Sequence, residues 1–156
     1  MSGLPFSREE RRDGAVALSY LLGQMAALLL MCDRHDLGVA LGSDEQAEAT
    51  PAFAPDRNAR AALEPWGTAD YVSTIYLYDN YPGGIGLSEP LYRHHWRLLR
   101  QSLSLIAACP CSDGCPSCVG PAEAVGSRGK EVALALLRTI LDEGREPLDR
   151  VEEGRT

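Results

Sequence analysis

The sequence predicts an α+β fold, with a small mixed sheet packed by three or so helices and a four-cysteine loop between the last two helices. Three observations predict it: a long apolar helical pattern near the start, a β-rich alternating segment at residues 71–78, and four cysteines within residues 109–118. With 156 residues, 45% of them hydrophobic, and no internal repeat, the chain can bury one compact core. We therefore expect a single domain over residues 1–144 and a charged, disordered tail at 145–156.

The first predicted element is a long buried helix. Ser7 and Glu10 fit a capping box that starts the helix near residue 8, and the apolar pattern continues to Met31. Residues 15–32 are apolar enough to be tested as a membrane span or a signal peptide. Polar residues within this stretch, acidic residues among the arginines before it and the lack of a small-residue cleavage site argue against both. We expect a cytoplasmic chain that does not contact a membrane.

The sheet is predicted from two segments. Leu37–Leu41 is a short β candidate, whereas residues 71–78 are a stronger one because β-branched and aromatic residues alternate along them. The stronger strand is expected near the centre of the sheet. Residues 42–68 are rich in Ala, Glu, Asp and Pro without a steady period, so they are predicted to form a long, flexible surface loop.

Two further helices are predicted in the second half of the chain. Ser88 and Pro90 mark the start of a helix that continues to about Ala108. Ser127 can cap a last helix, which has a broad apolar face and ends at Gly144. The cysteine loop lies between these two helices.

The cysteine loop is the most informative segment of the chain. Its spacing is C-x-C-x₃-C-x₂-C, formed by Cys109, Cys111, Cys115 and Cys118. Four thiolates are a common closed, tetrahedral ligand set for Zn²⁺, and Gly114 allows the tight reversal that brings them together. An iron–sulfur cluster is a minor alternative, because the bacterial run has a different spacing. A disulfide pair and unliganded thiols are further alternatives, although neighbouring positions such as 109 and 111 bridge only with strain.

A second candidate site is the turn that follows the stronger strand, at residues 78–86. Its carboxylate and amide side chains are Asp79 and Asn80, and Gly83 and Gly84 follow. A carboxylate at a strand end that faces the amides of a helix start could contact a ligand. No phosphate-binding motif is present, and a tight strand-to-helix turn that needs glycine is the plainer interpretation.

Three arginines form a possible contact face. Arg93, Arg97 and Arg100 share one side of the predicted helix, opposite its leucines. That side could contact phosphate or an acidic partner, which leaves an independent nucleic-acid-binding module as an alternative function. The plainer interpretation is a solvated helix face, because a chain of net charge −7 is a poor binder of a long phosphate track by itself.

Catalytic groups can be combined only into incomplete sets. Asp79 with Glu89 could pose as a carboxylate pair, and Ser88 with His94 and His95 as a partial hydrolytic set. The sequence identifies no base with an orienting partner for either set. A closed four-cysteine site also leaves no coordination position on the metal for a water molecule. We expect this chain not to be an enzyme, with a hydrolase or nuclease centred on Asp79 as the least favoured alternative.

Several segments resemble the MrfA-like zinc-binding domain, which occurs at the C-terminal end of a group of DEAD/DEAH-box superfamily 2 DNA helicases. The segments are Leu30–Asp33, Asp36–Val39, Tyr76–Leu87, Cys109–Pro121 and Lys130–Leu137. The resemblance implies one structural Zn²⁺ held by the four cysteines. It also implies a helicase in DNA repair or phage defence, whose motor domains are partners in cis or in trans and through which DNA is contacted. The nucleotide-binding loop and motor domains are not in this sequence, so ATP hydrolysis and unwinding do not carry over to it.

Overall fold

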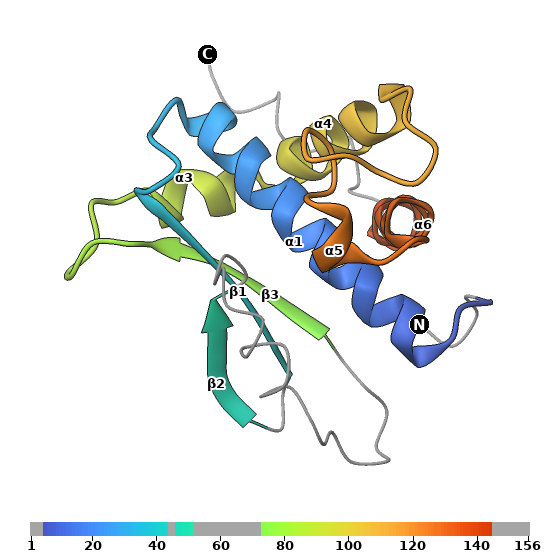
Figure 1. Cartoon of the computed structure of the whole chain (residues 1–156). Helices are drawn as coiled ribbons and strands as arrows, with labels where there is room; N and C mark the ends of the chain where they lie inside the picture. Colours follow the sequence, from blue (N-terminus) through green and yellow to red (C-terminus); the bar gives the residue numbers. More distant parts are fainter. Residues whose placement is uncertain (1–4, 44–45, 52–72, 145–156) are drawn as a thin grey trace.

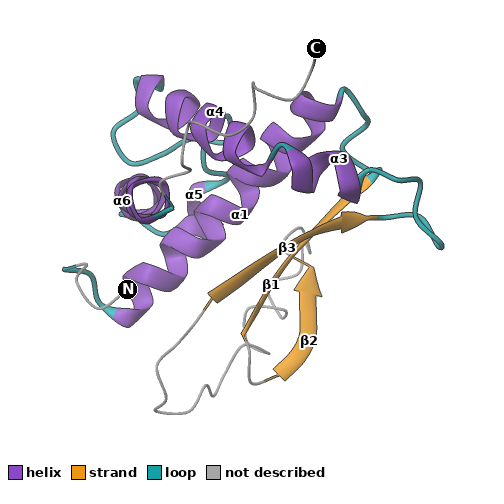
Figure 2. Ribbon diagram, turned by 180° about the vertical axis from the view of Figure 1, so that it is seen from behind, coloured by secondary structure: helices purple, strands orange, loops and turns teal. Residues whose placement is uncertain are grey.

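The structure is a computed structural model that describes residues 5–43, 46–51 and 73–144. Helices pack together on one side of a small sheet, with α1 between the sheet and the later helices (Figure 1, Figure 2). The α+β class is confirmed, as is the position of the cysteine loop between α4 and α6. The predicted tail lies outside the described residues. The elements are α1 (Arg8–Leu30), β1 (Leu37–Ser43), β2 (Gln46–Pro51), β3 (Ser73–Asp79), α3 (Ser88–Arg93), α4 (His95–Ala108), α5 (Ala122–Val125) and α6 (Gly129–Glu143).

Helix α1 is the central element of the core. The predicted capping box starts it: the Ser7 hydroxyl accepts a hydrogen bond from the Glu10 amide at 3.2 Å, and the Ser7 amide donates to the Glu10 carboxylate at 2.8 Å. By length and composition alone α1 would also pass as a membrane span or a signal sequence. However, 56% of its most apolar window is buried within the protein, against α4, α6 and the sheet. This packing is that of a core helix.

The sheet has the strand order β2-β1-β3, and both pairings are antiparallel. In the part of the chain that the structure describes, the predicted small sheet is therefore antiparallel rather than mixed. The expectation that the β-rich segment is central was wrong as well, because β1 is the middle strand of the described sheet and β3 lies at its edge. The aromatic alternation of β3 reflects a half-solvated face instead: Tyr76 and Tyr78 are 45% and 40% exposed.

Part of the predicted surface loop is a strand. Residues 46–51 form β2 and residues 42–43 extend β1, while residues 52–68 lie outside the described residues. The β2 segment has few residues with high β propensity, so its local sequence did not predict a strand. Its backbone pairs with β1, with Leu41 opposite Thr50, and this pairing outweighs the weak local preference.

The predicted helix over residues 88–108 is interrupted at His94, which has φ −105° and ψ 16°. The interruption separates α3 from α4, and both Leu91 in α3 and Leu98 in α4 are buried in the core. Burial of both leucines favours two helices at an angle over one straight helix, and local propensity does not reveal this.

The last helix begins later than predicted. Arg128 is the N-cap residue of α6 and no side chain caps the helix, so Ser127 does not have the predicted capping role. A left-handed Gly126 (φ 73°) turns the chain just before the helix, and the Gly129 amide donates to the Gly126 carbonyl at 3.4 Å. At the other end the Gly144 amide donates to the Ile140 carbonyl at 2.9 Å, so the predicted end is confirmed.

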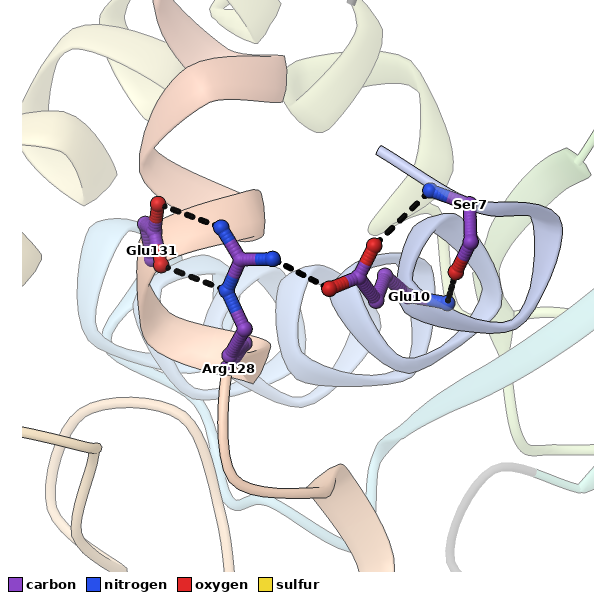
Figure 3. Close-up of polar contacts among 4 residues, drawn as sticks. All are labelled: Ser7, Glu10, Arg128 and Glu131. Carbon is purple, nitrogen blue, oxygen red and sulfur yellow. Dashed lines mark hydrogen bonds and ion pairs between the residues drawn. The ribbon is translucent and has the colours of Figure 1, made fainter. Parts of the chain in front are cut away.

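An ion-pair network links the start of α1 to the start of α6 (Figure 3). The Arg128 guanidinium donates two hydrogen bonds to Glu131, at 2.8 and 2.9 Å, and pairs with the Glu10 carboxylate that also closes the α1 capping box. It also lies 5.2 Å from the centre of the Phe6 ring. The network joins residues 118 positions apart, so it fixes the two helix starts relative to each other.

This network predicts an acid-sensitive contribution to stability. The Ser7 backbone amide, followed by the Ser7 hydroxyl and Arg128, lowers the pKa of Glu10, and Arg128 lowers the pKa of Glu131. A pKa lowered by folding gives stability that is present above the unfolded value of 4.5 and is lost as the pH falls through the folded value. The free energy of unfolding of Arg128→Met should therefore fall less steeply than that of the wild type between about pH 5 and pH 3.

The matched control is Arg138→Met, which removes the same charge from an exposed position of α6. Urea denaturation across the pH range would provide the free energies. If Arg128→Met and Arg138→Met gave the same acid dependence as the wild type, the network would not contribute to it.

Candidate metal centre

Four cysteine sulfurs converge after the end of α4. Cys109 is the C-cap residue of that helix, and its sulfur lies 3.4 Å from that of Cys111 and 3.6 Å from that of Cys115. The Cys118 sulfur lies 3.5 Å from that of Cys111 and 3.6 Å from that of Cys115. All four sulfurs lie within 4.8 Å of one another, so the structure brings the predicted ligand set together.

These distances fit one tetrahedral ion. A tetrahedron with metal–sulfur bonds of about 2.3 Å has sulfur–sulfur edges of about 3.8 Å. A disulfide would need a separation of about 2.05 Å, and the five cysteines of the chain are free thiols in this structure. An iron–sulfur cluster distributes its cysteines over several irons and therefore spreads the sulfurs further apart. The compact group favours a single metal ion.

The loop backbone is shaped to hold this geometry. Gly114 has φ 115°, and a Cβ atom at this position would lie 2.4 Å from a methyl carbon of Val119. Glycine is therefore required here for both conformation and space. Beyond the reversal, the amides of Cys118 and Val119 donate to the Cys115 carbonyl at 3.0 and 3.1 Å. The Cys115 amide in turn donates to the Cys118 sulfur at 3.3 Å, a contact that favours a thiolate.

The sulfurs differ in their surroundings. Cys118 is only 1% exposed and belongs to the hydrophobic core, and burial raises its pKa to about 12. Burial also opposes ionisation of Cys111, but hydrogen bonds from the neighbouring cysteines and from Lys130 outweigh it and lower the pKa of Cys111 to about 7. The Ser117 amide lowers the pKa of Cys115. Because metal ligands must be thiolates, binding at this site would release protons.

Lys130 is a site residue that the sequence analysis did not identify. It lies in the first turn of α6, and its ammonium nitrogen is 2.8 Å from the Cys109 carbonyl oxygen and 3.4 Å from the Cys111 sulfur. The available signal was compositional, because Lys130 is the only lysine in the chain. Cys32, by contrast, lies outside the sulfur group.

The turn after β3 uses its polar side chains for internal contacts. The Asp79 carboxylate accepts from the Leu87 amide at 3.0 Å and from the Ser88 hydroxyl at 3.3 Å, so it bridges the turn to the start of α3. Asn80 donates from its side chain to the His35 carbonyl at 3.0 Å. These contacts support the interpretation as a structural turn. A ligand at this turn stays a prediction.

The glycines of this turn are required by its backbone conformation. Gly83 and Gly84 have φ values of 87° and 72°, and a Cβ atom on Gly84 would lie 3.1 Å from the Asp79 carboxylate. Both positions therefore need glycine.

The three arginines do not share one helix. Arg93 is the last residue of α3, where it pairs with Glu89, whereas Arg97 and Arg100 lie on α4 beyond the interruption. All three are exposed. The predicted continuous face is therefore divided between two helices, and contact with phosphate or a partner stays a prediction.

The predicted catalytic sets are engaged in local contacts. Glu89 pairs with Arg93 rather than with Asp79, and the Ser88 hydroxyl donates to the Asp79 carboxylate. The His95 ring nitrogen lies 2.6 Å from the Tyr92 carbonyl oxygen. These contacts place no histidine against Ser88, so they do not assemble the nucleophile and base that hydrolysis requires.

Together, the fold and the sulfur group define a small α+β metal-binding domain built on a four-cysteine loop. More narrowly, the chain belongs to the MrfA Zn-binding domain family, whose sequence model matches residues 18–119. The matched range includes all four cysteines.

Two curated relatives are similar in sequence. The chain is 35% identical over 122 residues to the uncharacterized ATP-dependent helicase YprA of Bacillus subtilis strain 168, which covers 78% of this chain and 13% of that protein. It is 45% identical over 47 residues to the uncharacterized protein MJ1572.1 of Methanocaldococcus jannaschii, covering 30% of this chain and 42% of that protein. The chain therefore spans less than half of the length of either relative.

The fold is similar to part of a solved helicase. The crystal structure of the DUF1998 helicase MrfA bound to DNA matches with a TM-score of 0.64 and 29% sequence identity. The match covers 90% of this chain and 16% of that one. The likeness is thus to one segment of a much longer protein.

We predict that removing a single sulfur prevents normal metal binding. In Cys115→Ser three sulfurs remain, so bound metal should fall well below that of the wild type, and the free energy of unfolding should drop by about 3 kcal/mol or more. Elemental analysis of the purified protein and thermal melting would measure both quantities.

Cys32→Ser is the matched control, because it removes a thiol outside the sulfur group. It should leave the metal content unchanged. Wild-type metal content and melting temperature in Cys115→Ser would contradict the assignment of four cysteine ligands.

Proposed function

We propose that this chain is a non-catalytic, zinc-stabilised accessory domain of an ATP-dependent DNA helicase, or a separate subunit for one. The observation that carries the proposal is the four-sulfur group within a fold of the MrfA Zn-binding domain family. The sequence similarity to a protein named as an ATP-dependent helicase, and the structural similarity to a helicase solved with DNA, support it.

The proposed metal is one structural Zn²⁺ per chain. Four cysteine ligands complete its tetrahedral coordination and leave no position for water or substrate, which is typical of a structural rather than a catalytic zinc site. Held in this way, the ion would connect the end of α4 to the core through Cys118. Its part is to stabilise the fold, because a small sheet of three strands contributes little stability by itself.

The proposed partners are helicase motor domains, in cis or in trans, with DNA contacted through the complex. The net charge of −7 argues against tight binding of DNA by this chain alone. We place the helicase in DNA repair or phage defence on the basis of the family resemblance. A cytoplasmic location would suit the site, since that compartment keeps thiols reduced.

A first prediction concerns the isolated chain. Purified protein should bind single-stranded DNA weakly at low salt, with no difference between the wild type and Arg97→Ala, because docking rather than phosphate contact is its proposed role. Fluorescence anisotropy of labelled DNA would measure the binding. Tight binding that weakens with salt and with Arg97→Ala would favour an independent nucleic-acid-binding module, and cleavage that disappears in Asp79→Asn would favour a nuclease.

A second prediction tests the accessory role directly. In YprA of B. subtilis, the segment that aligns with this chain can be exchanged for it, since the two are 35% identical over 122 residues. The chimera should retain ATP-dependent unwinding of a labelled duplex, and the same chimera carrying Cys115→Ser should lose most of it. Deletion of the segment is the control. Unwinding that is equal with and without the segment would contradict an accessory role.

A further inference from the structure

Lys130 is a buried cation beside the sulfur group. The residue is only 7% exposed, although it lies in the first turn of α6. Its ammonium nitrogen lies 2.8 Å from the Cys109 carbonyl oxygen, donates to the Cys111 carbonyl oxygen as well, and lies 3.4 Å from the Cys111 sulfur. All three acceptors belong to the cysteine loop, which is 19 to 21 positions away in sequence.

The geometry suits lysine specifically. A lysine ammonium has three N–H donors that point in different directions, whereas the arginine guanidinium is a flat fork that matches carboxylates and phosphates. The three acceptors around the Lys130 nitrogen match its three N–H donors one for one. All the other basic residues of the chain are arginines, so the only lysine occupies the position where an ammonium fits best.

The charge of this lysine needs a negative partner. Burying an ammonium ion is strongly unfavourable unless it is hydrogen-bonded and its charge is compensated. None of its three acceptors is a carboxylate: two are neutral carbonyls and the third is a cysteine sulfur. Four thiolates around one Zn²⁺ carry a net charge of −2, which would supply the missing compensation.

We propose that Lys130 is the counter-charge of the loaded metal centre and the clamp that attaches α6 to the cysteine loop. The inference rests on the zinc site proposed above. It adds a positioning residue from outside residues 18–119, the range that the family model matches. The hydrogen bond to the Cys111 sulfur lowers the electron density of that ligand, and the two carbonyl contacts hold the loop against the first turn of α6.

The test measures zinc affinity and the electronic state of the sulfurs. Lys130→Met keeps most of the length and the apolar character of the side-chain stem but removes its charge, so it should bind Zn²⁺ about 10- to 100-fold more weakly in competition with a chelator. In the Co²⁺-substituted protein, its sulfur-to-cobalt charge-transfer band should move to longer wavelength, because the Cys111 sulfur loses a hydrogen bond. Lys130→Arg, which keeps the charge, should recover part of the affinity and of the band position.

Arg138→Met is the matched control, since it makes the same change in net charge at an exposed position on α6. It should leave both readouts unchanged. Wild-type affinity and band position in Lys130→Met would overturn the proposal while leaving the zinc site intact. A wild-type protein that binds no Zn²⁺ would instead overturn the proposed function as well.

A measurement on the unaltered protein covers the case in which Lys130→Met does not fold. Lys130 is the only side-chain amine, so acylation with an N-hydroxysuccinimide ester followed by mass spectrometry reports on it alone, apart from the chain's α-amino group. In the zinc-loaded protein it should react more slowly than the same lysine in a free peptide of residues 127–133, because the ammonium is buried and hydrogen-bonded to the loop. Equal rates would show that the ammonium is not held by the loop.

Discussion

The convergence of four sulfurs determines how the last two long helices meet. Cys109 ends α4, Cys118 is buried in the core beside Val119, and the same loop accepts hydrogen bonds from Lys130 in α6. Each of these anchors belongs to a different part of the helical layer. Like-charged thiolates at 3.4 to 3.6 Å repel one another unless a cation lies between them, so the loop geometry and metal binding depend on each other.

The rest of the fold depends on α1, which lies between the helical layer and the sheet. A sheet of three strands is only marginally stable in isolation, so its inner face must be covered. Leu37 belongs to the same buried cluster as residues of α1, and Ile75 and Leu77 pack against that cluster. On the other side α1 contacts α6 and α4, and the Arg128 network secures its start. Helix α1 therefore connects the helices on either side of the metal loop to the sheet.

Sequence predicted those features that local chemistry specifies. The capping box at Ser7, the glycine end at Gly144 and the cysteine spacing each depend on neighbouring residues, and each was found in the structure. Tertiary pairing decided the features that were mispredicted. Residues 46–51 become a strand only because β1 offers them an edge, and the break at His94 accompanies the burial of Leu91 and Leu98 together. Lys130 was missed for the same reason, because nothing within four residues of it suggests the loop that it contacts.

The distribution of polar chemistry suggests where reactivity lies in a larger assembly. The metal ligands form a closed set, and the carboxylate of Asp79 is occupied in bridging its turn to α3. Among the catalytic candidates, Asp79, Ser88 and Glu89 are thus engaged in contacts that hold elements together. A domain organised in this way contributes rigidity. The free energy of metal binding would stabilise its folded shape rather than a transition state. Under the proposed accessory role, any effect on DNA would follow from the position that this shape imposes on a motor domain.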